Sequence, residues 1–316
     1  MLTFVVRRFA SMILVLFCVV TITFILAQLA PGSPFTTERA IPPAVLEQLA
    51  KNYNLNGSIL ENYATYLGVR RNVSGQFDGL LQGNMGPSVK YRSHTVYELI
   101  RDSLPVSAVL GGAAFLIATG IGIWLGCLAA MRHHTYIDTG SMLSALALIS
   151  MPTFVVGPLL VLIFAIWLNW LPVGGWGSMK SLILPAITLA GPYIAYVARL
   201  MRSSMLEVLR QDFVRTAKAK GLTDTQAVYR HVLKVAVLPV VSFVGPLAAN
   251  LLTGSIVVER IFNIPGMGPF FVNSILNRDT FLICGVVMVY CALLVFMNLV
   301  VDIAYSMLDP RIRIYD

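Results

Sequence analysis

Charge is what this sequence has least of. Asp, Glu, Lys and Arg together make up 12% of its 316 residues, whereas 57% are hydrophobic. Soluble globular proteins carry about a quarter charged residues and about half apolar ones. A mean hydropathy of +0.77 therefore excludes a soluble domain and indicates an integral membrane protein.

Cysteine and histidine are also rare. The cysteines fall within apolar stretches and form no C-x-x-C pair, which predicts small buried side chains rather than a metal site or a disulfide framework. The histidines lack the spacing of metal ligands, and two of them fall in a short turn where we expect solvated side chains. The residues are Cys18, Cys127, Cys284 and Cys291, with His94, His231 and the turn pair His133 and His134.

Catalytic motifs are missing as well. The sequence contains neither an H-E-x-x-H zinc motif nor a G-x-S-x-G nucleophile elbow. The dipeptide Gly-Lys is absent, so there is no phosphate-binding G-x-x-x-x-G-K-[ST] loop. We therefore expect no catalytic, cofactor-binding or metal-binding residues, and the chain cannot hydrolyse ATP through such a loop.

What the sequence does contain is long apolar runs. A span needs about 20 residues to cross about 30 Å of hydrocarbon, and six runs qualify: 9–29, 104–131, 140–169, 182–203, 235–258 and 280–307. The first follows Arg7 and Arg8 as in a signal peptide, but it exceeds the usual 7–15 apolar residues and lacks an A-x-A site, so we expect a retained helix. The fold class is therefore all-α with six transmembrane helices.

The distribution of basic residues predicts the orientation. With the N terminus inside, the cytoplasmic segments hold Arg7, Arg8, Arg132, the cluster from Arg199 to Lys234, and two more arginines near the C terminus. The short loops on the other side hold only Lys180, Arg260 and Arg278. The positive-inside rule therefore places both termini in the cytoplasm, and the segment 31–103 is too long for the rule to apply.

The spans divide the chain into an N-terminal helix at 1–30, an extracytoplasmic insert at 31–103, a core at 104–307 with a cytoplasmic loop at 204–234, and a tail at 308–316. In the insert, Val45, Leu49 and Tyr53 predict a short amphipathic helix after Pro42 and Pro43. The insert is either a docking or gate-covering element or a plain surface loop. Prolines in the third, fourth and fifth spans, such as Pro152, predict kinks.

Ionisable groups within the predicted spans bear on the energy source. Asp302 is the only acid well inside one, and it lies near the cytoplasmic surface, where water or the basic loop can satisfy it. Ion-coupled transporters usually place ionisable groups near the midplane, and this chain offers none there. Glu259 and Arg260 lie at the external end of the fifth span. They either contact a substrate terminus, or they pair with a docked protein or stabilise the fold.

The basic loop shows helical periodicity. In LRQDFVRTAKAKG, Leu209, Phe213 and Ala217 recur at fourth positions, opposite Gln211, Arg215 and Lys218, which predicts an amphipathic helix beside the membrane. Gly221 suits a helix stop. Thr223 and Gln226 form a capping box for a second helix running towards Pro239.

Three interpretations of this loop compete. It can bind anionic lipid headgroups, resemble a DNA-binding helix-turn-helix, or dock into a separate cytoplasmic protein. A helix pair tied between two spans offers no dimeric surface for reading DNA, so we expect no nucleic-acid partner. Because the chain carries no motor of its own, docking into a cytoplasmic protein explains the loop best.

The residues of the loop carry a resemblance. R-T-A-K-A-K-G-L, at 215–222, resembles the coupling loop of ATP-binding-cassette importer permeases, in their peptide and nickel branch. Arg215 stands where the wider family has glutamate. The segments LAPGSPF (29–35), GNMGPSVKY (83–91), GSIVVERIFNIPGMG (254–268), LNRD (276–279) and VDIAYSMLDPRIR (301–313) are similar to oligopeptide permeases.

The resemblance implies a type I importer permease fold in a bacterial inner membrane, surrounded by lipid. It implies a heterodimer with a second permease subunit, two cytoplasmic ATPases that bind ATP and Mg, and an extracytoplasmic peptide-binding protein. It also implies that the ATPase contacts come from the loop, namely from Phe213, Arg215, Thr216, Ala217, Lys218, Gly221 and Leu222. Dipeptide or nickel import, an ion-coupled transporter and a membrane-embedded enzyme are the alternatives.

Overall fold

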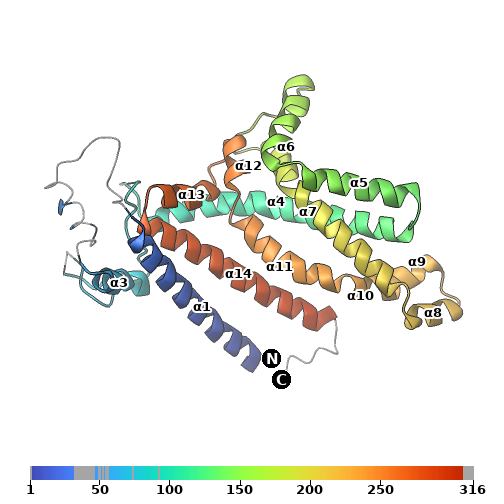
Figure 1. Cartoon of the computed structure of the whole chain (residues 1–316), viewed down its shortest axis with the longest axis horizontal. Helices are drawn as coiled ribbons and strands as arrows, with labels where there is room; N and C mark the ends of the chain where they lie inside the picture. Colours follow the sequence, from blue (N-terminus) through green and yellow to red (C-terminus); the bar gives the residue numbers. More distant parts are fainter. Residues whose placement is uncertain are drawn as a thin grey trace. The chain divides into compact units, whose positions relative to one another are not determined.

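The computed structural model describes residues 2–31, 47–48, 51, 53, 57–72, 75–91 and 93–308 (Figure 1). The predicted amphipathic helix around Val45 and Leu49, most of LAPGSPF and the tail from 309 onwards lie outside the described residues. Within the described part, the regular structure is helical, apart from an isolated β-bridge between Pro87 and Thr95.

Among the described residues, five segments are long and apolar enough to cross a membrane, and there is a sixth span if the two helices of one bent pair together count as one span. The long helices are α1 (Leu2–Leu29), α4 (Val96–Met131), α7 (Met179–Val208) and α14 (Thr280–Leu308), and the fifth segment joins α11 (Leu238–Leu252) to α12 (Ile256–Ile261). The six-helix prediction is thereby confirmed, with the bent pair as one span. The shorter helices outside the pair are α3 (Ile59–Leu67), η1 (Leu80–Gln82), α8 (Asp212–Ala219), α9 (Asp224–Ala227), η3 (Val228–Val232), α10 (Leu233–Ala236) and α13 (Gly268–Leu276).

The third predicted span, 140–169, is not one straight helix. It consists of α5 (Tyr136–Ser150), followed by α6 (Thr153–Leu160) and η2 (Val161–Trp167), with a bend of 104° between the two parts. Pro152 disfavours helical backbone at the preceding residue, and Met151 is accordingly extended, with φ −91° and ψ 119°. A kink was predicted at this proline, but a complete break is observed.

The chain divides into two compact units. Unit 1 comprises Met1–Arg8, Ser107–Pro265 and Leu293–Asp316, and unit 2 comprises Phe9–Val106 and Gly266–Ala292. The expected insert at 31–103 therefore falls in unit 2, together with most of α1, the start of α4, α13 and the first turns of α14. Each unit is described separately below.

Unit 1 is built around α7, the most buried of the spanning helices. Helix α5 packs along α7 (Figure 1), and α4 approaches it through glycines. A Cβ on Gly126 would lie 2.6 Å from the Ala198 carbonyl oxygen, and one on Gly122 would lie 2.7 Å from the Val197 Cβ. Small residues at such contacts let membrane helices approach closely, so one side of α7 is fixed within its own chain.

Unit 2 has an aromatic core and one buried carboxylate. The rings of Phe24 and Tyr66 stack with centroids 5.2 Å apart. Asp279, with 0% exposure, accepts hydrogen bonds from the backbone N–H groups of Val89 (2.9 Å) and Lys90 (3.1 Å) and from the Ser88 hydroxyl. It also caps α14 by accepting from the Leu282 N–H at 3.2 Å. The segments GNMGPSVKY and LNRD, far apart in sequence, thus meet through one side chain.

Candidate functional site

The loop that the sequence predicts to be cytoplasmic begins where the buried end of α7 stops. Met201, Met205 and Val208 are buried, and the chain then turns through 209–211, with the Gln211 N–H donating to the Val208 carbonyl at 3.0 Å. Helix α8 starts at Asp212, a favourable charge near the positive end of a helix dipole. It therefore begins three positions later than the predicted start at Leu209.

Helix α8 buries a different stripe from the one predicted. Val214 (1% exposed) and Ala217 (8%) face inward, whereas Phe213 is 40% exposed. The predicted apolar face is right for Ala217 but wrong for Phe213, and Leu209 belongs to the turn before the helix. An aromatic ring therefore stands on the outer surface of α8, next to basic side chains.

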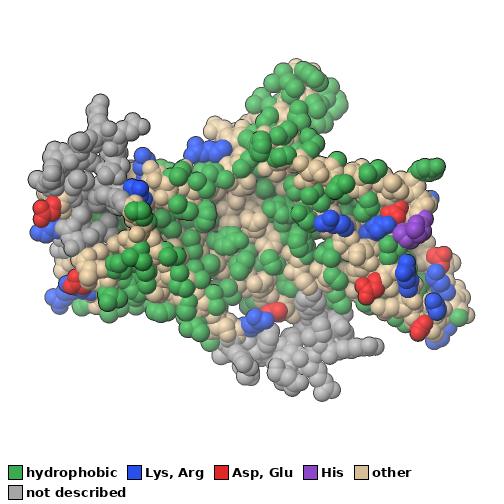
Figure 2. Space-filling model, in the orientation of Figure 1, with side chains coloured by type: hydrophobic (Ala, Val, Ile, Leu, Met, Phe, Trp, Pro, Cys, Tyr) green, Lys and Arg blue, Asp and Glu red, His purple; other side chains and the backbone are tan. Residues whose placement is uncertain are grey.

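The outer surface of α8 is basic. Arg215 and Lys218 are exposed, and each has a nearby acid: Asp212 lies 3.6 Å from Arg215, and Asp224 lies 2.7 Å from Lys218. Such exposed pairs contribute only about 0–1 kcal/mol, so both cations can exchange these partners for acids on another protein. Figure 2 shows Lys and Arg gathered at the end of unit 1 that carries α8 and α9.

Gly221 ends α8 as the sequence predicts. The Gly221 N–H donates to the Lys218 carbonyl (2.9 Å), and the Leu222 N–H donates to the Ala217 carbonyl (3.3 Å). This pair of bonds is a Schellman motif, which requires left-handed backbone at the glycine, and φ of Gly221 is +92°. A Cβ built there would meet nothing within 4 Å, so the space around the glycine is open within this chain.

The predicted capping box is confirmed. The Gln226 N–H donates to Thr223 Oγ1 at 3.3 Å, and the Thr223 N–H donates to Gln226 Oε1 at 3.1 Å. From there α9, η3 and α10 follow one another into α11, and Val228, Val232 and Ala236 are buried. Helix α8 packs against α9, and α10 packs against α7. The loop is thus a helical knob held firmly on α7.

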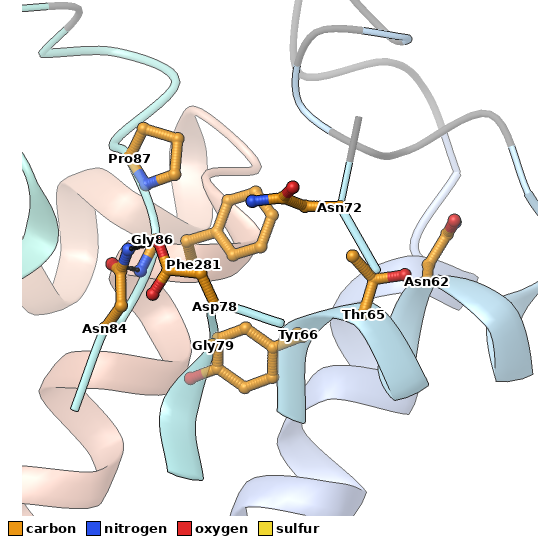
Figure 3. Close-up of a pocket in the computed structure, with 10 residues that line it drawn as sticks. All are labelled: Asn62, Thr65, Tyr66, Asn72, Asp78, Gly79, Asn84, Gly86, Pro87 and Phe281. Atoms are coloured by element: carbon orange, nitrogen blue, oxygen red, sulfur yellow. Dashed lines mark hydrogen bonds between the residues drawn. The ribbon is translucent and has the colours of Figure 1, made fainter. Parts of the chain in front are cut away.

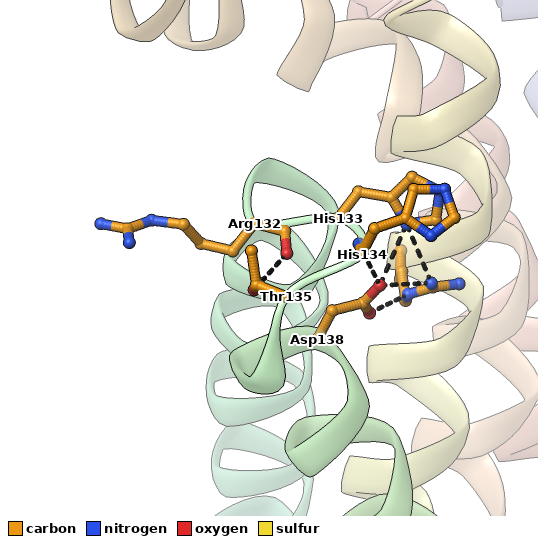
Figure 4. A network of polar contacts seen from close by, with 6 residues as sticks. Arg132, His133, His134, Thr135 and Asp138 are labelled. Atoms are coloured by element: carbon orange, nitrogen blue, oxygen red, sulfur yellow. Dashed lines mark hydrogen bonds and ion pairs between the residues drawn. The ribbon is translucent and has the colours of Figure 1, made fainter.

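A buried ion pair lies at the same end of unit 1 (Figure 4). Asp138, 4% exposed, receives two hydrogen bonds from Arg202 of α7, Nε to Oδ1 at 2.5 Å and Nη2 to Oδ2 at 2.7 Å. The His134 N–H also donates to Asp138 Oδ2, at 3.2 Å, and His133 Nδ1 lies 3.0 Å from the same oxygen. The turn between α4 and α5 is therefore tied to α7.

Sequence reasoning missed this cluster. His134 is exposed as predicted, but His133 is only partly exposed and contacts the ion pair. Two signals were available: an acid four residues after His134 at a helix start, and an arginine, Arg202, inside the apolar run 182–203. Neither specifies the other as its partner, because 64 residues separate Asp138 from Arg202.

Two further predicted residues have defined partners in unit 1. Asp302 lies 2.7 Å from the Arg8 guanidinium, so the N-terminal helix, rather than the basic loop, supplies its cation. Glu259 is 1% exposed and accepts from the Ser107 hydroxyl at 2.7 Å and the Ser255 N–H at 3.3 Å. These contacts favour the structural role for Glu259.

Unit 2 contains a small pocket of about 90 Å³ between α3, the segment around Gly79 and the start of α14 (Figure 3). Its polar groups hold the segment 78–86 together: Asn84 donates to Asp78 at 2.8 Å and accepts from the Gly86 N–H at 2.9 Å. Burial raises the pKa of the Tyr66 hydroxyl, so this residue is a neutral phenol at physiological pH. Among the described residues, no group of three His, Cys, Asp or Glu side chains could hold a metal ion.

Two family models match successive parts of the chain. The family described as "Binding-protein-dependent transport system inner membrane component" matches residues 122–314, and the family of the corresponding N-terminal component matches residues 1–111. One solved structure, described as "Inward facing conformations of the MetNI methionine ABC transporter", superposes with a TM-score of 0.47 and 16% identity, over 68% of this chain and 94% of the other.

Curated relatives match along their full length. The chain is 46% identical over 315 residues to the "Oligopeptide transport system permease protein OppB" of Salmonella typhimurium (strain LT2), which covers 99% of this chain and 100% of the relative. It is 39% identical over 315 residues to the "Dipeptide transport system permease protein DppB" of Bacillus subtilis (strain 168), over 100% of this chain and 99% of the relative.

Proposed function

The chain belongs to the family of binding-protein-dependent transport system inner membrane components, and on this premise we propose that it is the permease subunit of an ATP-driven oligopeptide importer. As a multi-pass protein of the bacterial inner membrane, it forms half of the pathway. The higher identity to an oligopeptide permease than to a dipeptide permease supports the choice of substrate.

The observation that carries the proposal is the helical knob. Helix α8 is fixed by Val214 and Ala217, and its outer surface presents Phe213, Arg215 and Lys218 to the cytoplasm. Aromatic and arginine side chains are typical of the residues that dominate protein interfaces. A chain that lacks a phosphate-binding loop needs such a contact to receive work from a separate ATPase.

We assign four partners to this chain. A second permease subunit completes the pathway, two cytoplasmic ATPases bind ATP and Mg, and an extracytoplasmic protein delivers the peptide. One ATPase receives Phe213, Arg215, Thr216, Lys218 and Leu222, with Ala217 supporting them from within. Closure of the ATPase pair then moves the knob, and the knob moves α7 and α11, which couples two sites through one element.

Uptake of three labelled substrates tests the function. A pentapeptide, a dipeptide and radioactive nickel are offered to cells that lack only this gene and to cells complemented with it. We expect the deletion to remove pentapeptide uptake and complementation to restore it. Loss of dipeptide or nickel uptake alone would keep the importer but overturn its substrate. Uptake that is abolished by a proton ionophore while ATP is maintained would indicate an ion-coupled transporter instead.

A further inference from the structure

Two spanning helices of unit 1 turn polar and aromatic side chains outward. On α7, Tyr196 is 40% exposed, Arg199 is exposed and Tyr193 is half-buried. On α11, Ser242, Pro246 and Asn250 are exposed at every fourth position, and Phe243, next to Ser242, is half-buried. Residues spaced by three or four positions share one side of a helix, so each helix contributes one continuous face.

The two faces form a single surface, which we call the α7–α11 strip: Tyr193, Tyr196, Arg199, Ser242, Phe243 and Asn250. Asn250 Nδ2 donates to Tyr193 Oη at 3.1 Å. The rings of Tyr196 and Phe243 have centroids 6.3 Å apart, and the Arg199 guanidinium lies 5.3 Å above the Tyr196 ring.

The strip is unsuited to lipid. The exposed residues of α4 show what a lipid-facing surface of this chain looks like, since Val109, Leu116 and Trp124 are 51%, 70% and 64% exposed. Amide, hydroxyl and guanidinium groups in a span normally face the interior of a bundle or a water-filled cavity, because hydrocarbon offers them no partners.

The strip is also unsuited to a close-packed helix of another subunit. Membrane helices associate through small residues that let their backbones approach. The small residues of α7, among them Ala190, Ala195 and Ala198, are fully buried against this chain itself. The bulky rings of Tyr193, Tyr196 and Phe243 occupy the outer side and would hold a second helix at a distance.

An extended peptide fits the chemistry of the strip. The Tyr193 hydroxyl and the Asn250 amide can each donate to, or accept from, a peptide backbone. Pro246 has no N–H, so the Ser242 carbonyl receives no helical hydrogen bond from that position and can accept one from a peptide N–H. Backbone groups are common to all peptides, so recognition through them does not depend on side chains. Arg199 suits a peptide carboxylate.

We propose that the α7–α11 strip is a wetted wall of the transport path and holds the peptide by its main chain. This inference rests on the proposed function, because it takes the substrate from there. It adds the residues that touch the peptide in transit.

Cysteine labelling of the assembled transporter tests the proposal. The four natural cysteines are replaced by serine, and single substitutions Tyr196→Cys, Ser242→Cys and Asn250→Cys are introduced, with Leu116→Cys as the control. A charged methanethiosulfonate is applied to both faces of membrane vesicles. The thiolate is the reactive form and apolar surroundings suppress it, so we expect strip cysteines to react at least about tenfold faster than the control. A saturating pentapeptide should slow them.

Three outcomes bear on the proposal. Fast labelling that the pentapeptide slows supports it. Labelling no faster than that of Leu116→Cys, or disulfide crosslinking of the strip cysteines to the second permease subunit, overturns it. Pentapeptide uptake by the wild type and by the cysteine-free parent is measured in parallel. Normal uptake by both, with strip cysteines that label no faster than the control, refutes the role of the strip alone, whereas absent uptake by the wild type refutes the proposed substrate.

Discussion

Replacing Gly221 by aspartate tests the docking of the knob most directly. The position has φ +92°, where a residue with a Cβ costs about 1–2 kcal/mol, and less for Asp and Asn, which tolerate left-handed backbone. A Cβ meets nothing within 4 Å, so no clash inside the chain adds to this. Against a stability of about 5–15 kcal/mol, Gly221→Asp should leave the protein folded and inserted in the membrane.

The larger effect should come from the partner. A groove that accepts the basic surface of α8 is expected to be acidic, and like charges across an interface cost several kcal/mol. Docking should then weaken at least about a hundredfold, since every 1.4 kcal/mol is a factor of ten. Gly221→Asn is the matched control, because asparagine has the same shape and backbone tolerance without the charge.

The assay compares both variants for pentapeptide uptake, membrane abundance and co-purification of the ATPases. We expect Gly221→Asp to abolish uptake and lose the ATPases at normal abundance, and Gly221→Asn to retain much of both. Normal uptake by Gly221→Asp would refute docking at this turn. Equal loss in the two variants would show that backbone strain, and not contact with a charged partner, explains the effect.

Four other substitutions give further tests. Phe213→Ala should leave the thermal stability of the purified chain without its ATPases within about 0.5 kcal/mol of the wild type, because the ring is exposed there, yet reduce uptake and ATPase co-purification; unchanged uptake would contradict a docking role for the ring. Asp138→Asn should destabilise the complex by about 1–3 kcal/mol by removing the bidentate contact with Arg202, measured as a lower melting temperature, and Arg202→Lys should do the same if the fork geometry matters. Asp279→Asn should speed protease cleavage around Ser88, and cleavage at the wild-type rate would show that the carboxylate does not hold that segment.

Local signals in the sequence were sufficient to predict the helix cap and the turn of the knob. The capping box at Thr223 and the turn at Gly221 depend on residues within a few positions of one another, and both are found as predicted. Phe213 shows the limit of this reasoning. Phe213 and Val214 are adjacent and lie about 100° apart around the helix, and each forms an apolar pair with Ala217, so periodicity alone could not decide which of the two faces inward.

Pairings between distant residues could not be predicted. Asp302 was expected to rely on water or the basic loop, but Arg8 lies beside it. The break before Pro152 likewise depends on what the two halves of the span pack against. Helix α6 contacts both α7 and α12, and those contacts stabilise an arrangement that a single apolar run does not reveal.

The knob and the α7–α11 strip are continuous along the chain, and this continuity leads to a last prediction. Helix α7 enters the knob and α11 leaves it, so any movement of the knob reaches both helices that carry the strip. Pro246 lies in the interior of α11, where it interrupts the helical hydrogen bonds beside Ser242, whereas Pro239 lies in the first turn, where no bond is lost.

Pro246→Ala restores a helical bond to the Ser242 carbonyl and withdraws it from the path. We expect the melting temperature of the complex to rise and pentapeptide uptake to fall. Pro239→Ala is the control and should change neither, because a proline at the start of a helix costs little. If Pro246→Ala stabilises the complex but leaves uptake intact, the open carbonyl has no part in transport, and the strip must hold the peptide through its side chains alone.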